Sequence, residues 1–158
     1  MVRFDVTKAA ELIFDARRDA GLTQALLALR VGISQPNLAQ MEAGKRTPSP
    51  EMLERILGAA DYRPSIPVER YAKRIRELAE HRGLRNPRVF GSVVRGEDHF
   101  DSDIDLLVSP SPQTTLFTLA ALAADVEDLT GFPADVVSDS GASTSMGTEN
   151  IVRQAVPL

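Results

Sequence analysis

The segment from Arg63 to Pro67, with prolines at positions 64 and 67, most constrains how this chain of 158 residues can fold. Proline has no backbone N–H and biases the residue before it toward extended conformations, so two prolines within four residues predict an extended connection. We therefore expect a first domain over residues 1–62, a linker over residues 63–67 and a second domain over residues 68–158. Each domain is long enough for one small hydrophobic core, since domains begin at about 50 residues.

The first domain has the apolar periodicity of short helices. Apolar residues recur at helical spacing from Lys8 to Asp19, with Thr7 placed as the N-cap and Gly21 just past the end. Three more helices are expected, each beginning after a hydroxyl cap: Thr23 to Arg30, Ser34 to Ala43 and Ser49 to Ala59. Four short helices with short connections predict an all-α bundle.

The second domain alternates helical and strand patterns. An amphipathic helix with a basic face is expected from Arg70 to Arg82, and an apolar helix from Leu116 to Thr130. Short strands are expected at residues 88–90, 103–109 and 134–138, and the stretch 138–148, rich in Ser, Thr and Gly, has the composition of a loop. This alternation predicts a small α/β or α+β domain with a short mixed sheet.

The second and third helices are joined by the tight turn Val31-Gly32-Ile33, which gives them the dimensions of a helix-turn-helix unit. In such a unit the second helix enters the major groove of DNA. A closer match is carried by Leu22-Thr23-Gln24-Ala25, Leu27-Ala28, Val31 through Leu38 and Met41 through Arg46. With these residues, the chain over about residues 8–60 resembles the Cro/C1-type (XRE) repressor family.

That resemblance implies that Gln24 contacts a phosphate and that part of the recognition helix faces the bases. Gln and Asn amides can pair with adenine edges, and Lys and Arg side chains can neutralise phosphates. The candidate DNA-binding residues are Gln24, Ser34, Gln35, Asn37, Lys45 and Arg46. The expected partner is a double-stranded DNA operator, and the alternative is a domain that retains this fold but binds protein.

The charge of the first domain bears on how it would bind DNA. Residues 1–62 carry eight basic and eight acidic side chains. Because phosphate neutralisation supplies much of the affinity for DNA, one copy is expected to bind modestly, and we expect a homodimer that reads two half-sites. Leu26 and Leu29 stand at positions that are usually polar in the repressor family, so they are candidates for a subunit interface.

The second domain contains a pair of carboxylates ten residues after a small-residue turn. Gly91-Ser92 is followed by Asp103-Ile104-Asp105 and an apolar run. Side chains alternate along a strand, so Asp103 and Asp105 must project from the same side. Two like charges so close together are costly unless a cation lies between them. The sequence has no cysteine and only two histidines, so the expected metal is a hard cation such as Mg²⁺, held by carboxylates.

The complete pattern over about residues 68–158 resembles the polymerase-β nucleotidyltransferase superfamily, and most closely its minimal nucleotidyltransferase (MNT) branch. Such domains have a third carboxylate on a following strand, and Asp135 stands in that position. The resemblance implies that Gly91, Ser92 and Arg95 bind the triphosphate of a nucleotide, expected to be ATP. A structural salt bridge from Arg95 to Asp98 or Asp101 is the alternative for that arginine.

The same resemblance implies that Asp103, Asp105 and Asp135 are the catalytic and metal-binding residues, holding two Mg²⁺ ions. One ion would carry the triphosphate and the other would activate the incoming hydroxyl, while Asp135 could also accept its proton. The expected reaction is in-line displacement of pyrophosphate.

Three functions fit the pairing of these two domains. The first is a DNA-binding, autoregulating antitoxin that transfers AMP to a hydroxyl of a partner protein, because the MNT branch often accompanies HEPN-type toxins. The second is a toxin that modifies tRNA, and the third is a regulator that uses the domain only to sense nucleotide. The sequence alone leaves all three open.

The distribution of charge and hydropathy along the chain is consistent with these three functions. Residues 63–90 carry eight basic and three acidic side chains, which suits either phosphate contact or a solvated helix face, whereas residues 91–158 carry two and eleven. The acidic end suits a site for divalent cations. The longest apolar stretch, Leu116 to Ala124, is far shorter than the roughly 20 residues of a membrane span, so we expect no membrane association and a cytoplasmic location.

Overall fold

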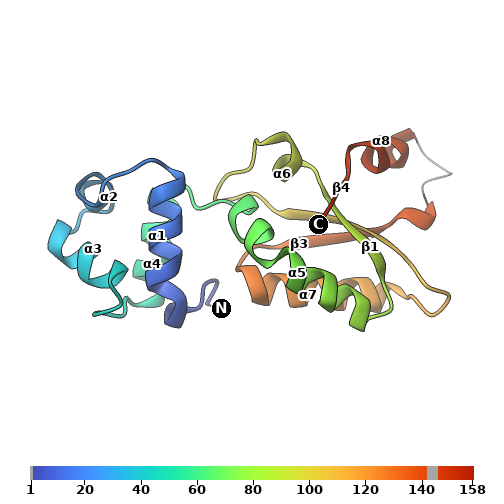
Figure 1. The fold of residues 1–158 in the computed structure, drawn as a ribbon, viewed down its shortest axis with the longest axis horizontal. Helices are drawn as coiled ribbons and strands as arrows, with labels where there is room; N and C mark the ends of the chain where they lie inside the picture. The colour runs from blue at the N-terminus through green and yellow to red at the C-terminus, as the bar shows by residue number, and fades with distance from the viewer. Residues whose placement is uncertain (1, 142–145) are drawn as a thin grey trace. The chain divides into compact units, whose positions relative to one another are not determined.

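The computed structural model describes residues 2–141 and 146–158. The chain forms two compact units, Met1–Arg63 and Pro64–Leu158 (Figure 1). The first unit is helical and the second combines helices with a sheet, so the predicted fold class is confirmed.

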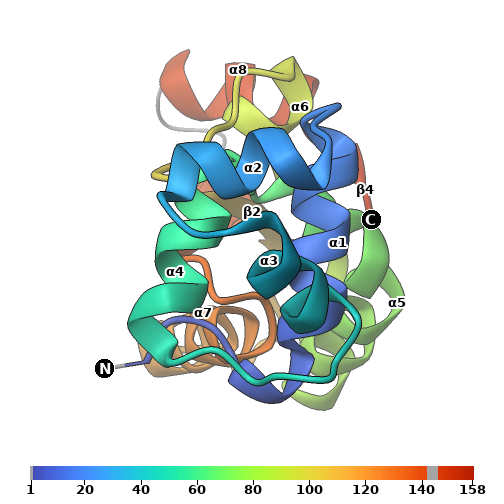
Figure 2. The ribbon, with the colours of Figure 1, turned by 90° about the vertical axis from the view of Figure 1, so that its left-hand side faces the viewer.

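The first unit is a bundle of short helices. Its elements are the 3-10 turn η1 (Val6–Lys8) and the helices α1 (Ala9–Asp19), α2 (Gln24–Val31), α3 (Gln35–Glu42) and α4 (Pro50–Ala59). Figure 2 faces the α2 and α3 pair. Fully buried side chains from all four helices form its core, among them Ile13, Leu27, Leu38, Leu53, Ile56 and Leu57. This order and packing agree with the predicted helix-turn-helix bundle.

Local capping explains why the helices begin and end where they do. The Thr23 and Ser49 hydroxyls accept hydrogen bonds from the backbone N–H groups of Leu26 (3.1 Å) and Met52 (3.2 Å). Gly32 ends α2 in the left-handed region, with φ of 77°, as the turn required. The predicted cap Thr7 is wrong: the Asp5 carboxylate accepts from the Thr7 N–H at 2.9 Å and starts the helical segment two residues earlier. A carboxylate is the stronger acceptor, and the Thr7 hydroxyl itself donates to it.

A nearly buried ion pair joins α1 to the end of α3. Arg17 donates to both carboxylate oxygens of Glu42, at 2.8 and 2.5 Å, and also to the backbone oxygen of Leu22 at 2.9 Å. The side chains of Arg17 and Glu42 are only 14% and 7% exposed. The pair therefore holds the recognition helix against the bundle through a bidentate contact shielded from water.

Removing one partner of this pair should destabilise the first unit strongly. We expect Glu42→Ala to lower the free energy of opening of α1 and α3 by about 3 kcal/mol, because Arg17 would remain as an uncompensated, shielded charge. Amide hydrogen exchange in those two helices of the full chain measures this. Asp19→Ala is the matched control, since the Arg63–Asp19 pair is about one-third exposed and should contribute less than about 1 kcal/mol. Equal losses in the two variants would contradict the assignment.

The second unit is a four-stranded mixed sheet with helices on both faces. Its strands are β1 (Arg85–Phe90), β2 (Ile104–Ser109), β3 (Ala134–Ser138) and β4 (Val156–Pro157), in the order β3-β2-β1-β4. The pair β2–β3 is parallel, and β1 is antiparallel to both β2 and β4. Its helices are α5 (Ser65–His81), α6 (Ser92–Arg95), α7 (Leu116–Thr130) and α8 (Met146–Gln154), with the 3-10 turn η2 (Asp139–Gly141) after β3.

The helices divide between the two faces of the sheet. In Figure 1, α5 and α7 cover one face, and α6 and α8 lie on the other. The core between the sheet and the α5–α7 layer contains the fully buried residues Ile75, Ile104, Leu106, Leu122, Val126 and Phe132. Alternate residues of β2 thus anchor the strand in the core and leave Asp105 on the opposite, more open face.

The predicted linker over residues 63–67 is wrong in its last part, because α5 begins at Ser65. Pro64 lies before the helix with helical backbone angles (φ −54°, ψ −35°), and Pro67 falls in the first turn of α5. The first N–H groups of a helix have no intrahelical acceptor, so a proline there removes no hydrogen bond. Two nearby prolines can therefore begin a helix instead of preventing one.

Two other boundaries differ from the sequence prediction. The strand β1 starts at Arg85 rather than Arg88, across an irregular register in which Asn86 has a φ of 51°. The expected loop over 138–148 contains η2 and the beginning of α8, while its residues 142–145 lie outside the described chain.

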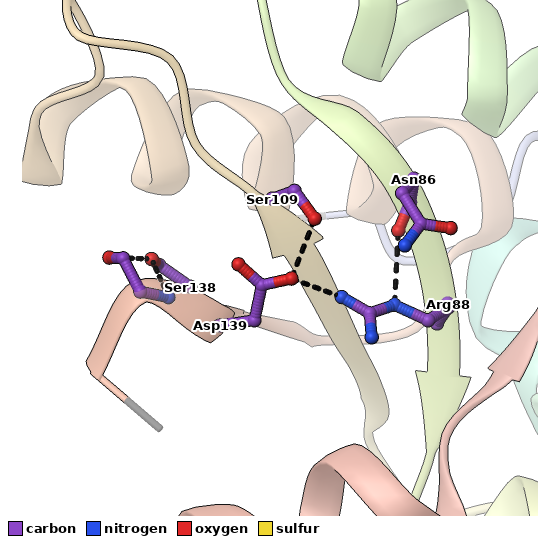
Figure 3. A network of polar contacts seen from close by, with 6 residues as sticks. Asn86, Arg88, Ser109, Ser138 and Asp139 are labelled. Carbon is purple, nitrogen blue, oxygen red and sulfur yellow. Dashed lines mark hydrogen bonds and ion pairs between the residues drawn. The ribbon is translucent and has the colours of Figure 1, made fainter. Parts of the chain in front are cut away.

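A polar network accounts for the turn η2, and Figure 3 shows it. Asp139 accepts hydrogen bonds from Arg88 on β1 at 2.5 Å and from the Ser109 hydroxyl at the end of β2 at 2.6 Å. Arg88 also donates to the backbone oxygen of Asn86 at 3.2 Å. These partners are far apart in sequence, so no local pattern could have revealed that this segment is held in place.

Candidate functional site

The turn between β1 and α6 comes into close contact with Asp105. Gly91 has a φ of 73° and a ψ of −144°, a conformation that residues other than glycine rarely adopt. A Cβ atom at this position would overlap the Asp105 carboxylate, whose Cγ would be 3.0 Å away. Glycine is therefore required here for two reasons, the backbone angles and the space taken by Asp105.

Strand register brings Asp105 beside the other carboxylate-bearing strand. Asp105 is the register partner of Phe90 at the end of β1 and of Asp135 on β3. Neighbouring residues in register project to the same face of a sheet, so Asp105 and Asp135 share the face on which α6 lies. Asp103 stands two residues earlier, just before β2 begins, and lies close enough for its charge to act on Asp105.

The electrostatics of this group differ from those of an ordinary surface carboxylate. Burial raises the pKa of Asp105, and the neighbouring charges of Asp135 and Asp103 raise this pKa further, while the charge of Arg95 lowers it. Asp105 is half-buried, whereas Asp103 and Asp135 are exposed. A cation at this position would relieve the repulsion that raises the pKa.

The oxygen donors fit a hard divalent cation by their chemistry and their charge. Within residues 2–141 and 146–158, no three carboxylate or histidine side chains are already grouped closely enough to hold a metal ion. Like charges repel each other, so their side chains are expected to converge only when a cation compensates them. The fit to a metal ion therefore rests on the backbone register of β2 and β3, which places Asp105 beside Asp135. It does not rest on the present positions of the carboxylate side chains.

Arg95 forms an ion pair within its own loop, with a partner two residues away. Its Nε donates to Glu97 at 2.7 Å, so the expected alternative of a salt bridge to Asp98 or Asp101 is wrong. Asp98 is instead buried and accepts a hydrogen bond from the backbone N–H of Ser65, the first residue of α5, at 2.7 Å. The Asp98 carboxylate therefore binds the N-terminus of α5 instead of pairing with Arg95. Asp98 thereby ties the loop that leads to Asp103 onto α5.

The predicted DNA-binding residues lie on α2, α3 and the turn that follows. Gln35 donates through Nε2 to Oε1 of Gln24 at 3.0 Å, and Arg46 donates to Oδ1 of Asn37 at 2.9 Å. Ser34 precedes α3, and its hydroxyl makes no capping bond to that helix. Ser34, Gln35, Lys45 and Arg46 are exposed, and Gln24 and Asn37 are partly so. The two amide contacts restrict the side chains that would face a DNA duplex.

This fold and this carboxylate arrangement define a small nucleotidyltransferase-type domain that follows a helix-turn-helix domain. A family model described as "Polymerase beta, Nucleotidyltransferase" matches residues 73–158, and a helix-turn-helix model matches residues 13–66. The chain belongs to the polymerase-β nucleotidyltransferase family and carries an XRE-type helix-turn-helix region before the family domain.

Two similar proteins agree with this membership. The chain is 36% identical over 81 residues to the protein adenylyltransferase MntA of Thermococcus cleftensis, a match that covers 51% of this chain and 81% of that protein. A solved structure described as a "putative minimal nucleotidyltransferase" is 37% identical and has a TM-score of 0.51, covering 58% of this chain and 92% of the solved one. Across the described residues, no helix is both long and apolar enough to cross a membrane.

Proposed function

We propose that this chain is a DNA-binding, antitoxin-like adenylyltransferase that transfers AMP from ATP to a hydroxyl of a partner protein. The observation that supports this most is the position of Asp105, which is in register with Asp135 and packed against the Gly91 turn. Such an arrangement would bring the turn that we propose binds phosphate and the carboxylates onto one face of one sheet. The relative named as a protein adenylyltransferase supports AMP as the transferred group and a protein as the acceptor.

Different residues of the chain would bind the triphosphate, hold the metal ions and accept the proton. Gly91 and Ser92 begin α6, where their backbone N–H groups can receive the triphosphate, and Arg95 adds positive charge nearby. Asp103, Asp105 and Asp135 would hold two Mg²⁺ ions, which supply charge compensation for the triphosphate and activate the attacking oxygen. Asp135, at the exposed edge strand, would accept the proton of the acceptor hydroxyl. The new bond joins that oxygen to the α-phosphorus as pyrophosphate leaves.

A tRNA acceptor is the second candidate, and it rests on the basic side of α5. Part of that charge is compensated locally, because Arg74 pairs with Glu77 at 3.2 Å and Lys73 approaches the same carboxylate at 4.0 Å. Compensated charges neutralise fewer phosphates, which favours the protein acceptor. We propose that this acceptor is a HEPN-type toxin and that the hydroxyl belongs to one of its tyrosines.

One incubation separates these functions. The protein is mixed with Mg²⁺ and ATP labelled at the α-phosphate, once with the product of the neighbouring gene and once with tRNA. Label on the protein partner, with a mass increase of one or more AMP groups, supports the proposal. Label on tRNA would reassign the chain as an RNA-modifying toxin, and tight ATP binding without transfer would reassign it as a nucleotide sensor.

For the first domain we propose binding to a double-stranded operator, with Gln35 reading a base. Gln35→Ala should then weaken binding to the specific site by about 1 to 3 kcal/mol and barely change binding to random duplex. Lys45→Ala is the control, since loss of a phosphate contact should weaken both duplexes and lower the salt dependence. Fluorescence anisotropy at several salt concentrations measures both. Similar losses on the two duplexes for Gln35→Ala would rule out base reading by this residue.

A further inference from the structure

The helix α7 has an apolar surface on the side that faces away from the sheet. Its sheet-facing side buries Leu122, Val126 and Thr130, as expected for a helix that covers a core. Yet Leu116 and Phe117 are 83% and 87% exposed. Thr118 is the only polar residue from Leu116 to Ala124. A surface helix normally presents polar residues to water, so the first half of α7, which is apolar on both sides, indicates a second partner.

A groove runs between one flank of α7 and the start of β3. It has a volume of about 420 Å³ and is lined by Leu116, Leu119, Ala120, Ala123, Ala124, Glu127 and Ala134–Val136. We call it the α7 groove. Its helical residues recur at intervals of three and four, which places them along a single side of α7. Alanines form much of its floor, so there is room for the larger side chains of a binding partner.

The α7 groove reaches the edge strand that carries Asp135. Asp135 belongs to its lining and is also the register partner of Asp105. In the described part of the chain, β3 has a neighbouring strand on one side only, so its outer edge leaves backbone groups available to a bound segment. A polypeptide paired with this edge would therefore run past Asp135, whose carboxylate lies on the other face of the sheet together with Asp105.

The chemistry of the groove selects among possible occupants. Among the described residues that line it, the charged ones are Glu127 and Asp135, and both are acidic. Apolar walls with acidic charges repel a phosphate backbone and suit a protein segment with apolar side chains and a basic residue. A second copy of this chain would block access to Asp135, which disfavours it as the occupant.

We propose that the α7 groove docks the acceptor protein, through a segment whose apolar side chains fill the groove and whose basic residue faces Glu127. This proposal rests on the proposed adenylyltransferase function and adds where and how its substrate binds. Docking energy from the groove would hold the acceptor hydroxyl at Asp135 without any part in ATP binding.

The test fills the groove from an exposed position of α7. Ala120→Arg and Ala124→Arg each place a long basic side chain in the groove at exposed positions, and arginine is a good helix former, so both variants should fold. Asp128→Arg is the matched control, because Asp128 is exposed on the same helix but does not line the groove. The acceptor used is the purified protein encoded by the neighbouring gene.

Two readouts are measured, one of them independent of catalysis. The first is the dissociation constant for the acceptor, determined in an Asp103→Ala background that cannot transfer nucleotide. The second is the KM and kcat of AMP transfer in the otherwise unchanged protein. We expect Ala120→Arg and Ala124→Arg to raise the dissociation constant and KM by about tenfold or more, with kcat and ATP binding little changed. Asp128→Arg should change each value by less than about twofold.

The outcomes separate the docking proposal from the proposed function. An acceptor that binds the groove variants as tightly as it binds the unchanged protein overturns the docking proposal, whether or not transfer occurs. Weaker binding in the groove variants without any transfer by the unchanged protein supports the docking and refutes the function. A dimer of this chain that Ala120→Arg converts to a monomer, or label on tRNA that the variant reduces, assigns the groove to another occupant and overturns the proposal.

Discussion

Gly91→Ala is expected to reduce nucleotide transfer by about a hundredfold or more, since displacement of reacting groups by about 1 Å can cost that much. The added Cβ would overlap the Asp105 carboxylate, and the backbone angles at residue 91 suit only glycine. Asp105 or the turn must therefore move, which separates the phosphate-binding N–H groups from the carboxylates. Steady-state transfer of labelled AMP to the partner measures the loss.

Gly96→Ala provides the matched control for this substitution. Gly96 lies at the other end of α6 in the ordinary left-handed region (φ 68°, ψ 28°), and a Cβ added there meets no atom within 4 Å. The backbone strain should cost about 1 kcal/mol of stability and leave transfer nearly unchanged. If both glycine variants lost transfer to the same degree, backbone strain rather than the contact with Asp105 would be responsible.

Asp105→Asn is expected to lower transfer by about a thousandfold, equivalent to about 4 kcal/mol of transition-state stabilisation, and to stabilise the metal-free protein at neutral pH. The loss follows from removing a metal ligand. Burial and the charges of Asp135 and Asp103 raise the pKa of Asp105, so its charged form is disfavoured in the folded state. Replacing it by a neutral amide therefore increases the stability of the metal-free protein. The two effects have opposite signs, which distinguishes this residue from one with a purely structural role.

The dependence of stability on pH follows from the direction in which the pKa of Asp105 is shifted. An acid whose pKa is raised by folding contributes stability below its unfolded value of about 3.8, and that contribution is lost as the pH rises through the folded pKa. The melting temperature of Asp105→Asn relative to the unchanged protein should therefore increase with pH above about 4 and then level off. Mg²⁺ with ATP should raise the melting temperature of the unchanged protein and have little effect on the variant.

Asp128→Asn removes the same charge from an exposed position of α7 and serves as the control. It should show neither the loss of transfer nor the gain in melting temperature. A variant Asp105→Asn that retained full transfer would exclude Asp105 from the metal site, whatever its stability.

Much of the fold could be predicted because its signals are local. The bounds of α4, α7 and β3 agree with the expected ones, since proline at a first helical turn, hydroxyl caps and alternating apolar residues act within a few residues of chain. The same locality explains the helix-turn-helix order, including the glycine that ends α2. The prediction failed at α5, where Pro64 and Pro67 are compatible with a helix start as well as with a linker.

The candidate site, like the fold, could be predicted from the sequence only in part. The sequence by itself determined that Asp105 projects to the side opposite Ile104 and Leu106, because alternation is a property of the strand alone. Only the tertiary structure decided that Gly91 packs against Asp105, that Asp135 stands in register beside it and that a groove lies between α7 and β3. Strand pairing, register and exposure depend on which distant segments meet, and they are set by the burial of the whole core rather than by neighbours in the chain.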